Sequence, residues 1–184
     1  LPEGEELERN LKVYEKLGTP GAYAETDGTH VAWDACPAGI RARFVGKEGY
    51  PTIAFNVTVT HNKRVIHVAP WCAGAVNDQT QAQHDPLMCD LKLGRIHPEI
   101  EYRLYDEHEV LIVHKGLYLI VDNGYHQWRC CQAPLKHAMS QGAAMWSERM
   151  ERCKAVECVF GMRSPYATPA VSKVSSACAV HCTT

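Results

Sequence analysis

The chain has 184 residues, with 19 lysines and arginines, 21 aspartates and glutamates, and a formal net charge of −2. Hydrophobic residues make up 46% of the sequence and charged residues 22%, a balance that is ordinary for a globular protein and excludes wholesale disorder. The length fits one domain or slightly more. The longest apolar runs span only a few residues, whereas a membrane-spanning helix needs about 20, so we expect no such helix.

The cysteines predict an intracellular protein that is not secreted. Nine of them, an odd number, are spread from Cys36 to Cys182 without a regular framework, and no charged-then-apolar leader opens the sequence. We therefore expect reduced thiols. A zinc site that uses Cys178, His181 and Cys182 is an alternative, but it is disfavoured because the sequence contains no Cys-x-x-Cys pair.

The first third of the chain predicts a helix, a short strand and a loop. Leucines and a tyrosine recur at helical spacing until Gly18, which indicates an amphipathic helix within residues 1–19. Residues 22–25 form a weak strand that leads into the turn-forming segment around Asp27. Residues 37–51 contain three glycines and two prolines among basic residues, which is typical of a loop.

Paired strands are predicted next. Residues 52–60 and 64–71 are rich in β-branched side chains and are separated by three residues, which favours an antiparallel hairpin. The polar segment 77–84 favours a loop that turns into a helix. A second pair of strands is predicted at residues 100–105 and 110–114.

The last third combines the strongest strand with a long helix. The strand covers residues 117–121 and ends directly at Asp122, and the pattern becomes helical over residues 143–160. We expect this strand to join the strand before Asp27. Three segments result: an N-terminal helix, a core and a poorly ordered tail, at residues 1–19, 20–161 and 162–184.

Three carboxylates are hard to explain as ordinary surface groups. Glu157 falls near the middle of the apolar stripe of the last helix, where an ionised side chain needs a partner. Asp122 ends the strongest strand, at an edge where buried strands open onto a crevice, and Asp27 follows a weaker strand. An ion pair with lysine or arginine is the alternative for Glu157, and a turn is the alternative for both aspartates.

Together these acids predict a site for divalent cations. Two strand-end aspartates and a helical glutamate can hold two Mg²⁺ ions through hard oxygen ligands. Two such ions about 3.5–4 Å apart clamp the attacking and leaving oxygens of an in-line phosphoryl displacement. The spacing alone is not specific, because 21 acids offer many possible triples.

Six segments add specificity through their order. They are Asp27-Gly28-Thr29-His30-Val31-Ala32-Trp33 with Cys36-Pro37, Gly46-Lys47 ahead of Tyr50-Pro51-Thr52-Ile53, and the segments 61–71, 74–78, 119–125 and 156–161. Over roughly residues 20–161 their order and approximate spacing resemble the PIF/Harbinger transposases, in particular the plant transposon protein branch of the DDE superfamily endonucleases.

The resemblance implies an α/β fold of ribonuclease-H-like type, a mixed sheet of antiparallel hairpin strands and a parallel strand, flanked by helices. It implies an acidic triad of Asp27, Asp122 and Glu157 that binds two Mg²⁺ (or Mn²⁺) ions, with Asp78 as a further metal ligand ranked below the triad. Members of the family are metal-dependent DNA endonucleases that cut transposon ends and join them to a target site.

The resemblance also implies partners and a location. Double-stranded DNA is the expected substrate, a Myb-like accessory protein is an expected partner, and the nucleus is the expected location. Two bound Mg²⁺ ions would make the formal charge of the chain positive, and the basic residues between Arg41 and Arg64 could then meet phosphates.

Two departures from the family pattern keep a second hypothesis open. Cys158 stands where family members usually carry an arginine, and residues 162–184 do not resemble the usual continuation. A truncated, degenerate or host-recruited copy would be a catalytically inactive ribonuclease-H-like domain that serves as a DNA- or protein-interaction module. All three triad acids are present in this chain, which keeps catalysis as the first hypothesis.

Overall fold

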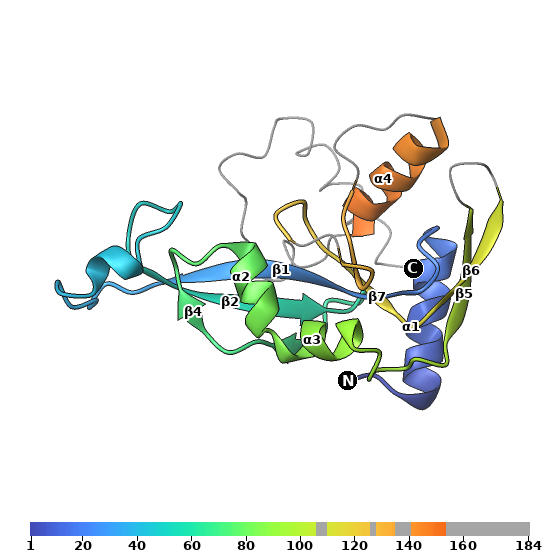
Figure 1. Ribbon diagram of the computed structural model, residues 1–184, viewed down its shortest axis with the longest axis horizontal. Coiled ribbons are helices and arrows are strands. Elements are labelled where there is room, and N and C mark those ends of the chain that lie inside the picture. The colour runs from blue at the N-terminus through green and yellow to red at the C-terminus, as the bar shows by residue number, and fades with distance from the viewer. Residues whose placement is uncertain (106–109, 126–127, 135–140, 154–184) are drawn as a thin grey trace.

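The computed structural model describes residues 1–105, 110–125, 128–134 and 141–153 (Figure 1). Within them the fold is α/β, as the sequence predicts. Its elements in chain order are α1 (Gly4–Lys16), β1 (Ala22–Ala32), the 3₁₀ turn η1 (Arg41–Arg43), β2 (Thr52–Val59), β3 (Val65–Val68), β4 (Cys72–Ala73), α2 (Asp78–His84), α3 (Pro86–Lys92), β5 (Glu101–Tyr105), β6 (Leu111–Lys115), β7 (Tyr118–Ile120), β8 (Cys131–Gln132) and α4 (Gln141–Cys153).

The main sheet is mixed and has the order β3-β2-β1-β7-β8, with β4 paired to β2. Strand β1 pairs antiparallel with β2 and parallel with β7, and β8 lies parallel to β7. The predicted hairpin of residues 52–71 is confirmed as the antiparallel pair of β2 and β3, and the strand at residues 117–121 joins β1 as expected. This arrangement is compatible with the expected ribonuclease-H-like core.

Strand β1 is much longer than the predicted strand at residues 22–25. It continues through the Asp27-Gly28 step to Ala32, because each residue from Glu25 to Ala32 pairs in register with a residue of β2. Cross-strand pairing with a β-branched partner strand outweighs the turn preference of Asp-Gly. The prediction that Asp27 follows a strand end is therefore wrong, because Asp27 lies inside the strand opposite Val57.

The predicted strands at residues 100–105 and 110–114 are confirmed as a separate two-stranded antiparallel sheet of β5 and β6. Tyr102 of β5 stacks on His114 of β6 and also contacts the ring of Tyr118. These ring contacts attach the small sheet to the β7 side of the main sheet, next to α1 (Figure 1).

The buried core lies on both sides of the main sheet. The larger cluster joins the sheet to α3 and α1 through Tyr23, Leu119, Val121, Leu87, Met88 and Leu7, and Figure 1 shows α2 and α3 crossing one face of the sheet. A second cluster joins α1 and α4 to the sheet through Tyr14, Ala22, Tyr118, Ile120 and Met150. Among the described residues, no helix is long and apolar enough to cross a membrane.

Helix α4 confirms the beginning of the helix predicted at residues 143–160. Its Trp146 and Met150 pack against the second cluster, as expected for a helix that covers the sheet. The remainder of the predicted helix, including Glu157, and the predicted tail at residues 162–184 lie outside the described residues.

We expect Met150→Ala to lower the free energy of unfolding by about 2–4 kcal/mol, because Met150 is fully buried between α1 and the sheet. Met145→Ala in the same helix is the matched control, since Met145 is 48% exposed and its loss should change stability by less than about 0.5 kcal/mol. Urea unfolding measures both variants. Equal effects would contradict the docking of α4 on the sheet.

Candidate acidic site at the end of β7

The chain turns sharply at the end of β7, and Asp122 forms the turn. All three residues of β7 are buried, and so is Val121. The Asp122 carboxylate then accepts a hydrogen bond from the Gly124 N–H through Oδ1, at 2.8 Å. This is the turn that the Asp-Asn-Gly sequence favours. Asp122 is thus both at the predicted strand end and in the predicted turn.

Asp78 meets Asp122 at Gly124. A Cβ atom added to Gly124 would lie 2.6 Å from Oδ2 of Asp78 and 3.0 Å from Oδ1 of Asp122. The two carboxylates therefore occupy the space that any larger residue at position 124 would fill. Glycine is required at position 124 because a side chain would fill the space of the two carboxylates. Its backbone conformation does not require glycine, since its φ angle is not in the left-handed region.

The local sequence explains why Asp78 reaches this point. Asn77 caps α2, with its side-chain oxygen accepting from the Thr80 N–H at 2.8 Å, so Asp78 is the first residue of the helix. An added Cβ on Gly28 of β1 would lie 3.4 Å from Oδ1 of Asp78. The side chain of Asp78 thus lies between β1 and the turn after β7.

The surroundings of Asp78 raise the pKa of its carboxyl group. Burial and then the negative charge of Asp122 raise the pKa of Asp78, while Lys47 and His30 oppose the change. Among the described residues, no ion pair joins either carboxylate to a lysine or arginine. Like charges in a half-buried place without a bound counter-charge are typical of a cation or functional site.

Asp27 lies on the neighbouring strand. In the parallel register the last pair is Glu25 with Ile120, so Asp27 and Asp122 each lie two residues beyond that pair. Side chains alternate along a strand, so Asp27 leaves β1 on the face opposite to that of Gly28. Its Oδ1 accepts from the Gly28 N–H at 2.8 Å.

Of the four predicted site residues, the structure thus brings Asp78 and Asp122 together. Asp27 stands on the adjacent strand, and Glu157 lies outside the described residues. In the part of the chain that the structure describes, no three His, Cys, Asp or Glu side chains form a ready metal site. The cysteines of the zinc alternative, Cys178 and Cys182, also lie outside that part.

The chain, with its mixed sheet and an acidic residue after β7, also matches a known protein family. The family model described as "plant transposon protein" matches residues 1–172. The chain belongs to the plant transposon protein family. The match agrees with the PIF/Harbinger resemblance and is longer than residues 20–161, so it includes α1 and the first residues after Gly161. Neither the curated proteins nor the solved structures give a significant match.

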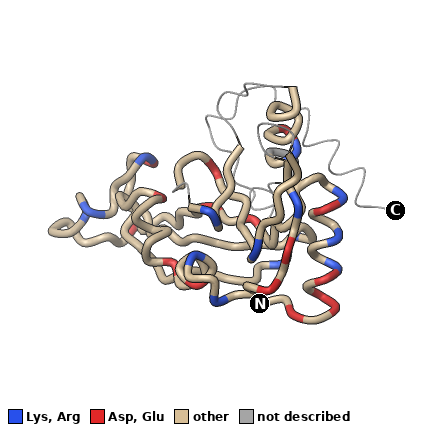
Figure 2. Tube along the Cα trace, turned by 45° about the vertical axis from the view of Figure 1, so that its right-hand side comes forward, with Lys and Arg blue, Asp and Glu red and all other residues tan. Residues whose placement is uncertain are grey.

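The basic residues of this plant transposon protein divide into two groups. Arg41, Arg43 and Lys47 lie in the loop beyond the Ala32 end of β1, whereas Lys63 and Arg64 lie at the other end of β2. Figure 2 shows lysines and arginines at both ends of the sheet. Arg64 pairs with Glu6 of α1. The basic residues between Arg41 and Arg64 therefore form two separate groups, because the extended strand β2 lies between them.

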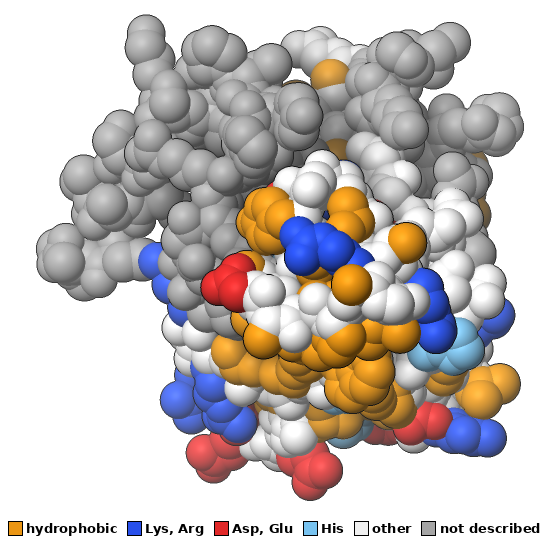
Figure 3. Space-filling model, turned by 90° about the vertical axis from the view of Figure 1, so that its left-hand side faces the viewer, with side chains coloured by type: hydrophobic (Ala, Val, Ile, Leu, Met, Phe, Trp, Pro, Cys, Tyr) orange, Lys and Arg blue, Asp and Glu red, His pale blue; other side chains and the backbone are white. Residues whose placement is uncertain are grey.

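The first group lies on a tip that we define as residues 33–51 together with Trp71. The Phe44 ring packs edge-on against Trp33, with centroids 4.8 Å apart, and stacks on Trp71 at 6.5 Å. Trp71 remains 62% exposed. Figure 3 views this end of the molecule and shows hydrophobic side chains gathered around basic ones.

The tip is close enough to the acidic pair to influence it. The Gly46 and Gly74 backbones touch, so that an added Cβ on Gly46 would clash with the Gly74 carbonyl. Lys47 follows directly, and its charge acts on both Asp78 and His30. Burial and then Lys47 lower the pKa of His30, whose Nδ1 lies 2.9 Å from Thr52 Oγ1.

Sequence patterns did not reveal three further residues near the acids. Tyr125, Asn56 and Asp85 are buried and are joined by hydrogen bonds. The only sequence signal was a polar residue inside an otherwise β-branched strand, at Asn56. Their roles depend on strand register, which spacing does not give.

We expect Asp78→Asn to raise the free energy of unfolding of the metal-free protein at pH 7 by up to about 1 kcal/mol, because it removes the repulsion from Asp122. A raised pKa in the folded state means that ionisation of Asp78 destabilises the fold. The advantage of the variant should therefore appear as the pH rises through that raised pKa and vanish below about pH 4, where the native carboxyl is protonated in both states.

Urea unfolding between pH 3 and pH 7 measures this difference. The control is Asp34→Asn, an exposed acid whose loss should change stability by less than about 0.5 kcal/mol at either pH. A variant of Asp78 that is destabilised at pH 7 would show that the carboxylate already has a favourable partner.

Proposed function

We propose that this plant transposon protein is a divalent-metal-dependent DNA endonuclease of transposase type, which hydrolyses phosphodiester bonds and joins the ends to a target. The observation that carries the proposal is the meeting of Asp78 and Asp122 at Gly124. Membership of the transposon family supplies the reaction class, and the acidic pair supplies a place where a cation would bind.

The chemistry of the pair fits Mg²⁺ or Mn²⁺. Mg²⁺ is commonly bound through one or two carboxylates, several waters and substrate phosphates rather than by a complete protein cage. The raised pKa of Asp78 indicates that a positive charge placed between the two carboxylates would relieve repulsion. Asp122 is the common residue, since it meets Asp78 on one side and its strand pairs with that of Asp27 on the other.

The triad remains part of the proposal. Asp27, Asp122 and Glu157 match the acids of the family motif and would hold two Mg²⁺ or Mn²⁺ ions, with Asp78 as an additional ligand. Bound metal would supply Lewis-acid stabilisation of the attacking and leaving oxygens. The protein residues would orient the phosphodiester and keep their carboxylates ionised.

The tip is the proposed contact for the DNA backbone. Arg41, Arg43 and Lys47 are exposed, and Lys47 lies within electrostatic reach of Asp78. Phosphate contacts of this kind position a duplex without reading its sequence. Recognition of a particular transposon end would then come from a partner, and the family resemblance proposes a Myb-like accessory protein and a location in the nucleus.

A second function is favoured by the exposed aromatic part of the tip. Trp71 and the neighbouring apolar side chains form a surface of the kind that often marks an interaction site (Figure 3). A catalytically inactive module that binds DNA or a protein would use this surface and would have no need of paired carboxylates. The endonuclease requires the acidic residues for its activity, whereas the interaction module does not.

Nicking of supercoiled plasmid in Mg²⁺ or Mn²⁺ tests the endonuclease. We expect the wild type to convert supercoiled to open-circular DNA, and Asp122→Asn and Glu157→Gln to reduce the rate about 100-fold or more, because each removes a charge that the transition state requires. Glu5→Gln is the control and should retain the wild-type rate, because Glu5 is exposed on α1 and lies outside the tip. Equal cleavage by all four proteins would assign the activity to a contaminant, and no cleavage would favour the interaction module.

Metal binding can be measured without DNA. We expect Gly124→Ala to weaken Mn²⁺ binding about tenfold in calorimetry, because the new methyl group would push the Asp78 and Asp122 carboxylates apart. Gly39→Ala is the matched control, since nothing lies within 4 Å of an added Cβ there. Unchanged affinity in Gly124→Ala would remove Asp78 and Asp122 from the metal site.

A further inference from the structure

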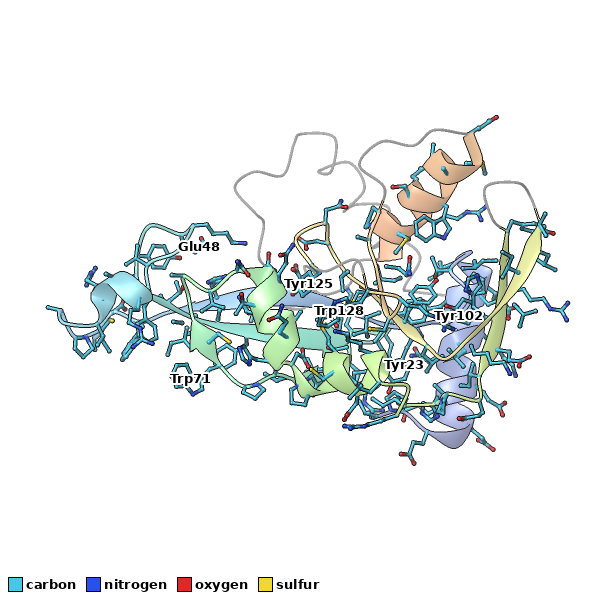
Figure 4. All side chains as sticks on the ribbon, viewed as in Figure 1. Tyr23, Glu48, Trp71, Tyr102, Tyr125 and Trp128 are labelled. Carbon is cyan, nitrogen blue, oxygen red and sulfur yellow. The ribbon has the colours of Figure 1, made fainter. Side chains whose placement is uncertain are left out.

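A chain of hydrogen bonds leads away from the acidic pair through the sheet. It begins at Tyr125, three residues after Asp122, whose hydroxyl donates to Oδ1 of Asn56 at 3.1 Å. The Tyr125 side chain is only 4% exposed, and Figure 4 shows it beside α2. An added Cβ on Gly28, the residue that Asp78 overlies, would lie 3.8 Å from the Tyr125 hydroxyl. Tyr125 and Asp78 thus share the space that Gly28 leaves open.

Asn56 connects the turn after β7 to helices α2 and α3 through two hydrogen bonds. It lies on β2, directly opposite Gly28 in the register, and is fully buried. Its side-chain amide donates through Nδ2 to Oδ2 of Asp85 at 3.3 Å. One amide therefore accepts from Tyr125 and donates to Asp85.

Asp85 stands at the junction of α2 and α3. It is fully buried, and its Oδ1 accepts from the Leu87 and Met88 N–H groups at the start of α3 and from His67 Nε2 at 2.9 Å. Four donors thus compensate the buried carboxylate. Asp85 also directly follows the last residue of α2, the helix that begins with Asp78.

The direction of every bond in the chain is fixed. The Asp85 carboxylate only accepts, so Asn56 must present its NH₂ group to Asp85 and its oxygen to Tyr125. The Tyr125 hydroxyl must then donate. Burial and the surrounding acids raise the pKa of Tyr125 well above its ordinary value, which keeps the hydroxyl protonated as a donor.

We propose that the chain Tyr125–Asn56–Asp85–His67 is a positioning device that holds the Asp78 and Asp122 carboxylates at the separation needed for metal binding, with Tyr125 as its main positioning residue. The two acids are attached to opposite ends of the device: Asp122 through the turn that Tyr125 closes, and Asp78 through α2, which Asp85 terminates. This inference rests on the proposed metal site and names residues that the family motif does not include among its acids.

Tyr125→Phe tests the device by removing one hydroxyl and leaving the ring. We expect Mn²⁺ affinity in calorimetry to fall about tenfold, as is usual when a group that orients metal ligands is lost. Tyr23→Phe is the matched control, because the Tyr23 hydroxyl is buried and has no hydrogen-bond partner among the described residues. It should bind Mn²⁺ like the wild type. Equal affinity in Tyr125→Phe and Tyr23→Phe would overturn the proposal.

An exchange of the two central side chains tests the direction of the bonds. Asp85→Asn alone places an NH₂ group against the NH₂ group of Asn56 and should weaken Mn²⁺ binding about tenfold. The double variant Asp85→Asn with Asn56→Asp reverses the bond, pairing a donor at position 85 with an acceptor at position 56, without changing the net charge. It should recover affinity to within about threefold of the wild type. Failure of the double variant to recover, when its folded structure is intact by circular dichroism, would count against the device.

Hydrogen exchange separates this proposal from the metal site itself. In the absence of metal, Tyr125→Phe should speed amide exchange in residues 78–85 and 119–125 together, more than Tyr23→Phe does. If the wild type fails to bind Mn²⁺ but this coupled acceleration occurs, the metal site is wrong, and only the structural coupling of the two segments by the hydrogen-bond chain is supported. If exchange in the two segments is unchanged, the device is wrong whatever the metal affinity.

Discussion

The constraint on which the site depends is the placement of two carboxylates against one glycine. Asp78 and Asp122 come from segments that meet only in the folded protein, and both lie within 3.0 Å of the position that a Cβ on Gly124 would take. Burial and then the charge of Asp122 raise the pKa of Asp78, so ionisation of this carboxyl opposes folding. Among the described residues, no lysine or arginine forms an ion pair with either carboxylate, and this is one basis for the cation that we propose there.

The position of β1 makes this meeting possible. It pairs antiparallel with β2 on one side and parallel with β7 on the other. These two pairings position the β2–β3 hairpin relative to the strand that precedes Asp122. The same register sets Asn56 opposite Gly28 and leaves the open space that Asp78 and Tyr125 share. Local hydrophobic burial of β7 then fixes the point at which the chain turns.

The sequence predicts most of the elements and part of the site. The β2–β3 hairpin and β7 follow from runs of β-branched residues, and Asp122 was found because it ends the clearest of those runs. Strand β1 was predicted too short because Asp27-Gly28 resembles a turn, and only pairing with β2 overrides that preference. Asp78 was ranked below the triad because it matches only a further acid of the family pattern. Its approach to Asp122 depends on the start of α2 and on the missing side chain of Gly124, which no local pattern contains.

One buried and one partly exposed aspartate in this structure show why burial alone does not identify a functional acid. Asp85 is the more deeply buried of the two, yet His67, Asn56 and two backbone N–H groups satisfy its carboxylate, so it stabilises the junction of two helices. Asp78 is partly exposed and faces another carboxylate. The charge of Asp85 is compensated by its donors, whereas that of Asp78 lies next to a like charge, which is why we propose a cation at Asp78 and not at Asp85. The difference between the two lies in their partners, and it assigns Asp85 to the support of the site and Asp78 to the site itself.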